Sequence, residues 1–302
     1  MKSDNLKESR NIEDRRGQSY SQSSGNSNLG GGILQILLSP GSFKSKIIII
    51  LLMVLLGGGA SLGGLFGNGS SQPYQSSQVT RTNQTHVDDA DAQFVSKVLG
   101  TTEDHWHKVF QAEGRTYQEP KLVFYTGRTK TGCGVGQASA GPFYCPTDKK
   151  IYLDMSFYKE LTTKYKASGD FAMGYVIAHE VGHHVQNELG ILGKYHRMQQ
   201  GLSEKERNAI SVRIELQADY LAGVWARSIQ DRNLLDIGDI EEAMNAAHAV
   251  GDDTLQEQAY GYSVPDSFTH GTSEQRMRWF KRGYQYGDLQ HGDTFSLSDS
   301  EL

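Results

Sequence analysis

The clearest periodic pattern in the chain begins at Asp170 and ends at Gly190. Within it Ile177, Val181 and Val185 recur every four residues, which places them on one face of a helix. Asp170 is a residue type that caps helix starts, and Gly190 is one that follows helix ends. The pattern therefore predicts a helix with one buried stripe.

A second long helix is predicted over residues 203–230. Ser203 and Glu206 have the spacing of a capping box, in which each side chain bonds the backbone of the other residue. The apolar stripe of this helix consists of Ile210, Ile214, Leu221 and Val224. Such a stripe predicts burial of one helix face against the rest of the domain.

The remaining patterns predict an α+β fold. Residues 89–113 and 237–250 have helical periodicity, with aromatic and aliphatic side chains available for burial. The β-branched and aromatic runs 121–125 and 150–154 predict strands. We therefore expect a mainly helical domain over residues 89–290 that contains a small antiparallel sheet.

The ends of the chain are more polar than the predicted domain. Residues 1–46 are rich in Ser, Asn and Gly, so we expect them to be disordered, because they cannot bury enough apolar surface.

Residues 47–66 are apolar and carry no charge. Twenty residues of helix span roughly 30 Å, enough to cross a bilayer, so we expect a transmembrane helix there. We expect a linker over residues 67–88 and a flexible tail over residues 291–302.

The charges beside the apolar stretch predict its orientation. Lys44 and Lys46 precede it, whereas Asp88, Asp89 and Asp91 follow it. The positive-inside rule then predicts a single-pass membrane protein with a cytoplasmic N-terminus and the bulk of the chain on the outer side. A cleaved signal peptide is the alternative, but a polar leader of 46 residues is long for one.

The chain contains two cysteines, Cys133 and Cys145, in a glycine-rich stretch. On the outer side of a membrane, two thiols close in sequence most simply form one disulfide; free buried thiols are the alternative. The net charge is −5, with no long basic run in the predicted domain, so we expect no nucleic-acid partner.

Candidate chemistry lies inside the first helix, where His179, Glu180 and His183 form the run H-E-x-x-H. Two histidines four apart share a helix face and can bind one metal ion. Glu180 lies beside that ion, where it can act on a metal-bound water as general base. The alternative is a core helix whose histidines only satisfy hydrogen bonds.

A catalytic zinc commonly has three protein ligands, so a third ligand is needed. The extended H-E-x-x-H-x-x-G-x-x-H motif fails, because Gln186 and Leu189 occupy its glycine and last histidine positions. In the second helix, Glu215 and Asp219 are four residues apart. We expect Glu215 to be the third zinc ligand and Asp219 to accept the N–H of a ligating histidine, most simply His179. A solvated acidic face is the alternative.

Two residues near the end of the domain are candidates for stabilising a transition state. His270 or Arg276, if close to the metal, could stabilise the oxyanion of a tetrahedral intermediate. The alternative is a helix capped by Thr272 or Ser273, with Arg276 in a structural salt bridge.

Two other segments allow more than one interpretation. Residues 137–141 are small and extended, and could bind a peptide substrate by β-addition; a disulfide-braced hairpin is the alternative. Asp252 and Asp253 are expected to cap a short helix rather than to bind metal.

These motifs together resemble the bacterial neutral zinc metallopeptidases, which are membrane-anchored, gluzincin-like proteins with H-E-x-x-H and a downstream E-x-x-x-D. The resemblance implies a zincin-like metallopeptidase fold, zinc at His179, His183 and Glu215, and hydrolysis of peptide bonds. It does not supply a substrate. The matching segments are 141–146, 151–154, 178–186, 215–223, 251–253 and 270–280.

We therefore predict a zinc endopeptidase that cleaves a peptide or protein substrate. We expect it to be anchored in a bacterial inner membrane by one helix, with a cytoplasmic N-terminus and a periplasmic or extracellular catalytic domain. Two alternatives stay open: a non-catalytic, zinc-stabilised scaffold or chaperone, and a zinc hydrolase of cell-wall amide bonds. The sequence does not indicate an oligomeric state.

Overall fold

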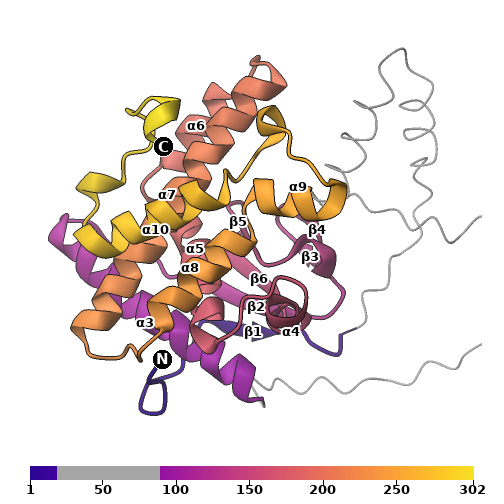
Figure 1. Cartoon of the computed structure of the whole chain (residues 1–302). Coiled ribbons are helices and arrows are strands. Elements are labelled where there is room, and N and C mark those ends of the chain that lie inside the picture. Colours follow the sequence, from indigo (N-terminus) through magenta and orange to yellow (C-terminus); the bar gives the residue numbers. More distant parts are fainter. Residues whose placement is uncertain (19–88) are drawn as a thin grey trace, which may run out of the picture.

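The computed structural model describes residues 1–18 and 89–302, in which helices surround a small sheet (Figure 1). The helices are α3 (Ala90–Ala112), α4 (Ser156–Thr163), α5 (Asp170–Glu188), α6 (Ile191–Met198), α7 (Glu204–Asp231), α8 (Asp239–Ala249), α9 (Asp252–Tyr260) and α10 (Ser273–Tyr286). The strands are β1 (Ile12–Asp14), β2 (Lys121–Tyr125), β3 (Arg128–Thr131), β4 (Gly134–Gln137), β5 (Phe143–Cys145) and β6 (Lys150–Asp154). The α+β expectation fits this arrangement.

Local capping explains where the long helices begin. The Asp89 side chain accepts the Ala92 N–H at the start of α3. A capping box formed by Ser203 and Glu206 starts α7, as the sequence predicts. A second capping box, formed by Thr272 and Gln275, starts α10. These contacts satisfy amide groups that have no partner inside the helix.

The sheet differs from the expected antiparallel one. Its strand order is β1-β2-β6-β5; β1, β2 and β6 run parallel, and only β5 pairs in the antiparallel direction. The expected strands β2 and β6 form, but the chain between them is long enough to bring β6 back to the same end of the sheet. That intervening chain contains β5 and a separate hairpin of β3 and β4. The prediction of an antiparallel sheet was wrong for this reason.

Residues 1–18 are also not disordered. Their strand β1 pairs with β2, with Ile12 opposite Leu122 and Asp14 opposite Phe124. Ile12 is 9% exposed and belongs to the hydrophobic core. The expectation of disorder is therefore wrong for residues 1–18, because backbone pairing to β2 orders a segment whose own composition is polar. Residues 19–46 lie outside the described residues.

The C-terminal residues pack onto the domain instead of forming a free tail. Thr294 is fully buried and Leu302 is 3% exposed. The Arg213 guanidinium on α7 donates to the backbone carbonyls of Thr294 and Leu297. Hydrogen bonds from a buried helix to the backbone explain why this polar segment is held in place.

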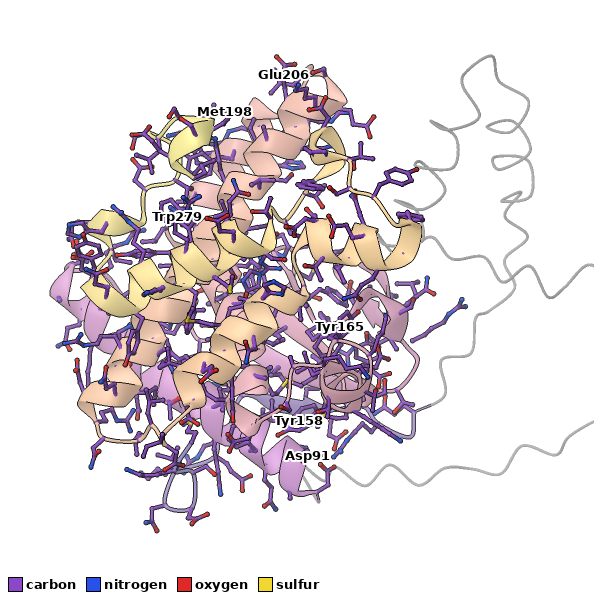
Figure 2. All side chains as sticks on the ribbon, in the orientation of Figure 1. Asp91, Tyr158, Tyr165, Met198, Glu206 and Trp279 are labelled. Carbon is purple, nitrogen blue, oxygen red and sulfur yellow. A yellow bond between two sulfur atoms is a disulfide. The ribbon has the colours of Figure 1, made fainter. Side chains whose placement is uncertain are left out.

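Helix α5 lies between the strands and a group of helices formed by α7, α8 and α10 (Figure 1). Helices α7 and α10 cross closely, since a Cβ at Gly223 would lie 2.0 Å from the Phe280 carbonyl oxygen. Trp225 of α7 stacks on Phe171 of α5, with the ring centroids 5.4 Å apart. Met198 and Glu206 lie at one end of the molecule and Asp91 and Tyr158 at the other (Figure 2). The middle of α5 is therefore the centre of the fold.

Within residues 1–18 and 89–302, no helix is both long enough and apolar enough to cross a membrane. The expected transmembrane stretch 47–66 and the linker 67–88 lie outside the described residues.

Candidate metal centre

The histidines of the H-E-x-x-H run lie in the buried middle of α5, facing α7. Gly182 allows the two helices to approach there, because a Cβ at this position would lie 2.9 Å from the Ala218 carbonyl oxygen. His179 and His183 are one turn apart, with ring centroids 4.8 Å apart and planes nearly perpendicular. The close helix contact brings the facing turn of α7, including Glu215, to the two imidazoles.

Three side chains from the two helices converge on one point. His179 Nε2 lies 3.1 Å from Glu215 Oε2, and His183 Nε2 lies 3.4 Å from Glu215 Oε1. One donor atom from each of the three residues lies within 4.8 Å of the others. Donors that bind zinc tetrahedrally at about 2.0–2.1 Å lie about 3.3 Å apart, so the spacing fits that metal. The structure thus brings together the three expected ligands.

The other ring nitrogen of each histidine, Nδ1, is hydrogen-bonded to a side chain that is not a predicted metal ligand. His179 Nδ1 donates to Asp219 Oδ1 at 2.8 Å, as the sequence analysis expects. His183 Nδ1 donates to Gln186 Oε1 at 2.9 Å. The Gln186 amide is itself oriented, since its Nε2 donates to the Ile214 carbonyl oxygen of α7 at 2.8 Å. With the proton of each ring held on Nδ1, both Nε2 atoms face Glu215. This tautomer leaves Nε2 free to bind a metal ion.

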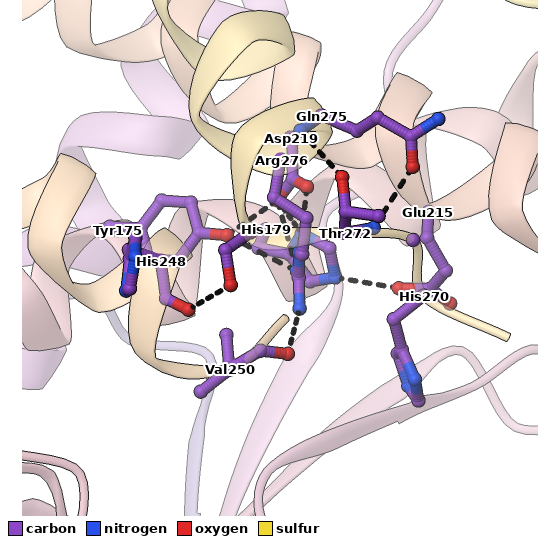
Figure 3. A network of polar contacts seen from close by, with 12 residues as sticks. Tyr175, His179, Glu215, Asp219, His248, Val250, His270, Thr272, Gln275 and Arg276 are labelled. Atoms are coloured by element: carbon purple, nitrogen blue, oxygen red, sulfur yellow. Dashed lines mark hydrogen bonds and ion pairs between the residues drawn. The ribbon is translucent and has the colours of Figure 1, made fainter. Parts of the chain in front are cut away.

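Asp219 is the centre of a buried polar network (Figure 3). Its carboxylate has no exposed surface and accepts the Tyr175 hydroxyl at 2.5 Å, in addition to His179. Arg276 of α10 donates to both Asp219 oxygens, at 2.9 Å from Nε and 3.1 Å from Nη2. Burial alone would raise the pKa of Asp219, but the charges of Arg276 and His179 outweigh it and lower the pKa to about 2. Asp219 is therefore an anion that fixes His179.

The charges of the cluster also change the pKa of His179 and Glu215. Burial lowers the pKa of His179, but the Asp219 and Glu215 carboxylates outweigh it and raise the pKa to about 10. Burial raises the pKa of Glu215, yet the charge of His183 and the hydrogen bonds from His179 and His183 hold it well below its ordinary value. A metal cation would replace the protons on these histidines, since neutral imidazole and carboxylate are its ligands.

Glu180 is 7% exposed and adjoins His179 on α5. Burial raises the pKa of its carboxyl, whereas the neighbouring His183 and His179 lower it, and the net shift is upward. A carboxyl with a raised pKa beside a metal centre has the acid–base properties that a general base needs.

His270 follows α9 and is oriented by Asp252. The Asp252 Oδ2 atom accepts the backbone N–H groups of Thr269, His270 and Gly271, at 2.7, 2.6 and 3.1 Å. The His270 Nδ1 atom lies 3.2 Å from Asp252 Oδ1, and about half of the side chain is exposed. Burial lowers the pKa of His270, but its hydrogen bond to Asp252 and the charges of Glu215 and Asp252 outweigh it and raise the pKa.

Arg276 does not stand beside the metal ligands as a free cation. Besides the two bonds to Asp219, its Nη1 donates to the Val250 carbonyl oxygen and its Nη2 to the Tyr175 hydroxyl, both at 3.1 Å. The side chain is 5% exposed. These contacts favour the alternative of a buried structural salt bridge over a role in stabilising an oxyanion.

The cysteine-containing stretch forms a braced hairpin. Cys133 at the turn between β3 and β4 is disulfide-bonded to Cys145 in β5, which confirms the expected pairing. Residues 138–140 form a short 3-10 helix after β4, outside the main sheet. The structure therefore supports the hairpin alternative for residues 137–141, and the sheet edge next to β6 is β5 instead.

Three residues of the site were missed as participants from the sequence: Gln186, Asp252, and Tyr175, which donates to Asp219. Gln186 entered the sequence analysis only as a mismatch to an extended motif, although it lies three residues after His183 on the same helix face. Asp252 was expected to cap a helix; Gly251 precedes α9 at that position, and the Asp252 carboxylate orients His270. The spacing of three could have indicated Gln186, whereas nothing local indicates the contact of Asp252.

Comparison with known proteins agrees with the geometry. The family described as "Putative neutral zinc metallopeptidase" matches residues 1–295. "Uncharacterized protein YpfJ" of Escherichia coli (strain K12) is 50% identical over 292 residues, covering 97% of this chain and 98% of that protein. "Uncharacterized protein Rv2575" of Mycobacterium tuberculosis (strain ATCC 25618 / H37Rv) is 44% identical over 194 residues, covering 61% and 64% of the two chains. No solved structure matches this chain. The chain belongs to the neutral zinc metallopeptidase family.

Proposed function

We propose that this protein is a zinc-dependent endopeptidase that is attached to a bacterial membrane through residues 47–66. The observation that carries the peptidase function is the convergence of His179 Nε2, His183 Nε2 and the Glu215 carboxylate at a spacing that fits zinc. Zinc held there supplies Lewis acidity, which lowers the pKa of water and polarises a peptide carbonyl.

The residues around this point divide the chemistry between them. Glu180 accepts the proton of the attacking water and delivers it to the leaving amine. His270, oriented by Asp252 and with a raised pKa, donates to the oxygen on which negative charge develops. Asp219 keeps the His179 ring in place and strengthens it as a ligand. Arg276 keeps Asp219 ionised in a buried position.

The compartment follows from the disulfide between Cys133 and Cys145. Disulfides persist in oxidising compartments, so we propose that the zinc centre faces the periplasm or the cell exterior. The substrate is then a peptide or protein of that compartment.

The test compares zinc content and peptide hydrolysis of the full-length wild type with those of Glu180→Gln, both purified in detergent. The variant should keep one equivalent of zinc and lose at least about a hundredfold in turnover, because the base is removed while all ligands remain. Glu188→Gln, at the end of α5, is the control and should keep both properties.

Undiminished hydrolysis by Glu180→Gln would reject the assigned base. The two alternatives give other results. A zinc-stabilised scaffold would complement a deletion strain equally well with wild type and Glu180→Gln, and a cell-wall hydrolase would release fragments from peptidoglycan but not from protein, as mass spectrometry would show.

A further inference from the structure

The strand β1 is an integral part of the sheet that supports the zinc helices. Its backbone bonds to β2 at both ends, since Leu122 N donates to the Asn11 carbonyl oxygen and Arg15 N donates to that of Phe124, both at 2.8 Å. The register places Ile12 opposite Leu122, and both side chains are in the core. Parallel backbone pairing of this kind requires both strands to lie in the same aqueous phase.

The residues on either side of β1 bind the domain as well. Ser9 N donates to the Ser96 carbonyl oxygen of α3 at 3.0 Å, and Ser9 Oγ donates to Glu103 at 2.5 Å. Within β1 itself, Glu13 accepts from Lys150 of β6 at 2.7 Å. The contacts of residues 1–18 therefore extend over β2, β6 and α3.

Residue 18 is the last described residue before the 19–88 segment, and Asp89 is the first after it. The Arg16 guanidinium forms an ion pair with Asp89, the residue that caps α3. It is also bound to Asp14 in β1 and lies over the Phe124 ring of β2, 5.3 Å from its centroid. The two ends of the 19–88 insertion are thus within reach of one side chain.

This arrangement is incompatible with one crossing of a membrane between residues 18 and 89. A single crossing would place β1 and β2 on opposite sides of a hydrocarbon layer roughly 30 Å thick. In the sequence of the insertion, only residues 47–66 form an uncharged apolar stretch of spanning length, and three glycines at 57–59 divide it. The first part, residues 47–56, would span only about 15 Å as a helix, half of that layer.

We propose that residues 1–18 lie in the same compartment as the zinc centre, because β1 and β2 are paired strands of one sheet. This proposal differs from the expected topology, in which the N-terminus and the catalytic domain lie on opposite sides of the membrane. The bilayer remains the partner, and the proposal holds or fails independently of the peptidase function.

The test uses single cysteines at two exposed positions of the full-length chain, Glu8→Cys in the N-terminal segment and Lys281→Cys on α10. Sealed spheroplasts are treated with a membrane-impermeant maleimide before and after lysis. The wild type measures the background, because Cys133 and Cys145 are disulfide-bonded. Both variants should be labelled to the same extent before lysis, or both only after it; the former places the zinc centre outside the cytoplasm and the latter inside.

Labelling of Lys281→Cys in sealed spheroplasts, with labelling of Glu8→Cys only after lysis, would overturn the proposal. The reverse pattern would do so too. A second measurement deletes residues 1–18 from the otherwise complete chain and records thermal unfolding in detergent. Loss of β1 should lower Tm by at least about 5 °C, since a core strand is removed; an unchanged Tm would also overturn the proposal.

Discussion

Helix α5 carries part of two clusters of side chains that could hold a cation, and they differ in chemistry. The cluster in its middle is His179, His183 and Glu215; the cluster at its N-terminus is Asp170, Asp239 and Glu242. We name them the zinc cluster and the acidic cluster. The zinc cluster has two imidazole donors, whereas the acidic cluster has carboxylates only, which suit harder cations than zinc.

The contacts around the two clusters differ even more. In the zinc cluster each imidazole is oriented by a partner that is itself fixed, Asp219 for His179 and Gln186 for His183. In the acidic cluster the carboxylates are already bound: the Met1 ammonium lies 3.1 Å from Asp170 and 3.2 Å from Asp239. Donor proximity alone therefore does not define a metal site. Imidazole donors that are held in place by fixed partners, and that can give up their protons to a metal, distinguish the zinc cluster.

The largest expected effect comes from removing the glutamate of the zinc cluster, compared with removing the glutamate of the acidic cluster. Glu215→Ala leaves only two protein ligands, so the purified protein should contain far less than one equivalent of zinc after dialysis and show no hydrolysis. Glu242→Ala should keep the metal and the activity. Metal analysis by mass spectrometry measures both variants. Loss of zinc from Glu242→Ala, with Glu215→Ala unaffected, would reverse the assignment of the two clusters.

The ion pair beside the zinc cluster, Arg276 with Asp219, should stabilise the fold more than the ion pair of Asp170 in the acidic cluster, because it is more deeply buried. Arg276→Met leaves the Asp219 carboxylate buried without its cation, which should lower the free energy of unfolding by about 3–5 kcal/mol. Asp170→Asn removes one partner of an ion pair in which the aspartate is 40% exposed, so its cost should stay below about 1 kcal/mol. Denaturant titration of the metal-free proteins measures both, and equal costs would contradict the comparison.

The pH dependence of metal binding should come from the zinc cluster. The pKa of His179 is raised to about 10 in the metal-free protein, so zinc must displace a proton at neutral pH. Apparent zinc affinity should therefore rise by about tenfold per pH unit from pH 7 toward 10, in zinc-buffered titrations. For the same reason, the stabilisation that the proton gives the metal-free fold is present below pH 6.5 and lost as the pH rises toward 10. A flat affinity profile would show that His179 is neutral before zinc binds.

The smallest effect should come from Gln186, which only orients a ligand. Gln186→Ala removes the acceptor of the His183 Nδ1 proton while all three ligands stay, so zinc affinity should fall by about tenfold. Asp219→Ala should cost roughly ten- to a hundredfold, because an anionic partner of His179 is lost. Competition with a chelator measures both. An unchanged affinity in either variant would mean that the site holds its histidines without that partner.

Local signals predicted much of this molecule. The capping residues predicted for α7 and α10, Ser203 and Thr272, mark helix starts because their side chains bond amides only three residues away. The spacing of His179 and His183 sets both rings on one helix face for the same local reason.

Contacts between residues that are far apart in sequence could not be predicted from such local signals. Strand β1 is a three-residue run of Ile, Glu and Asp, which has strand geometry only because the edge of β2 is available to it. The direction of β6 depends on the path of the whole chain between residues 126 and 149. Arg276 and Asp219 are 57 residues apart, so no spacing could decide between an oxyanion role and a structural salt bridge.

The sequence by itself determined the chemical types of the ligands, the helices that carry them and the cysteine pair. Periodicity and capping depend on residues that are close in sequence, so they can be predicted from the order of residues alone. Only the tertiary structure decided which nitrogen of each histidine faces Glu215, that Arg276 is used by Asp219, and that residues 1–18 share a sheet with β2 and β6. Those outcomes depend on how closely helices and strands approach, and the close contact of α5 with α7 at Gly182 exists only in the folded protein.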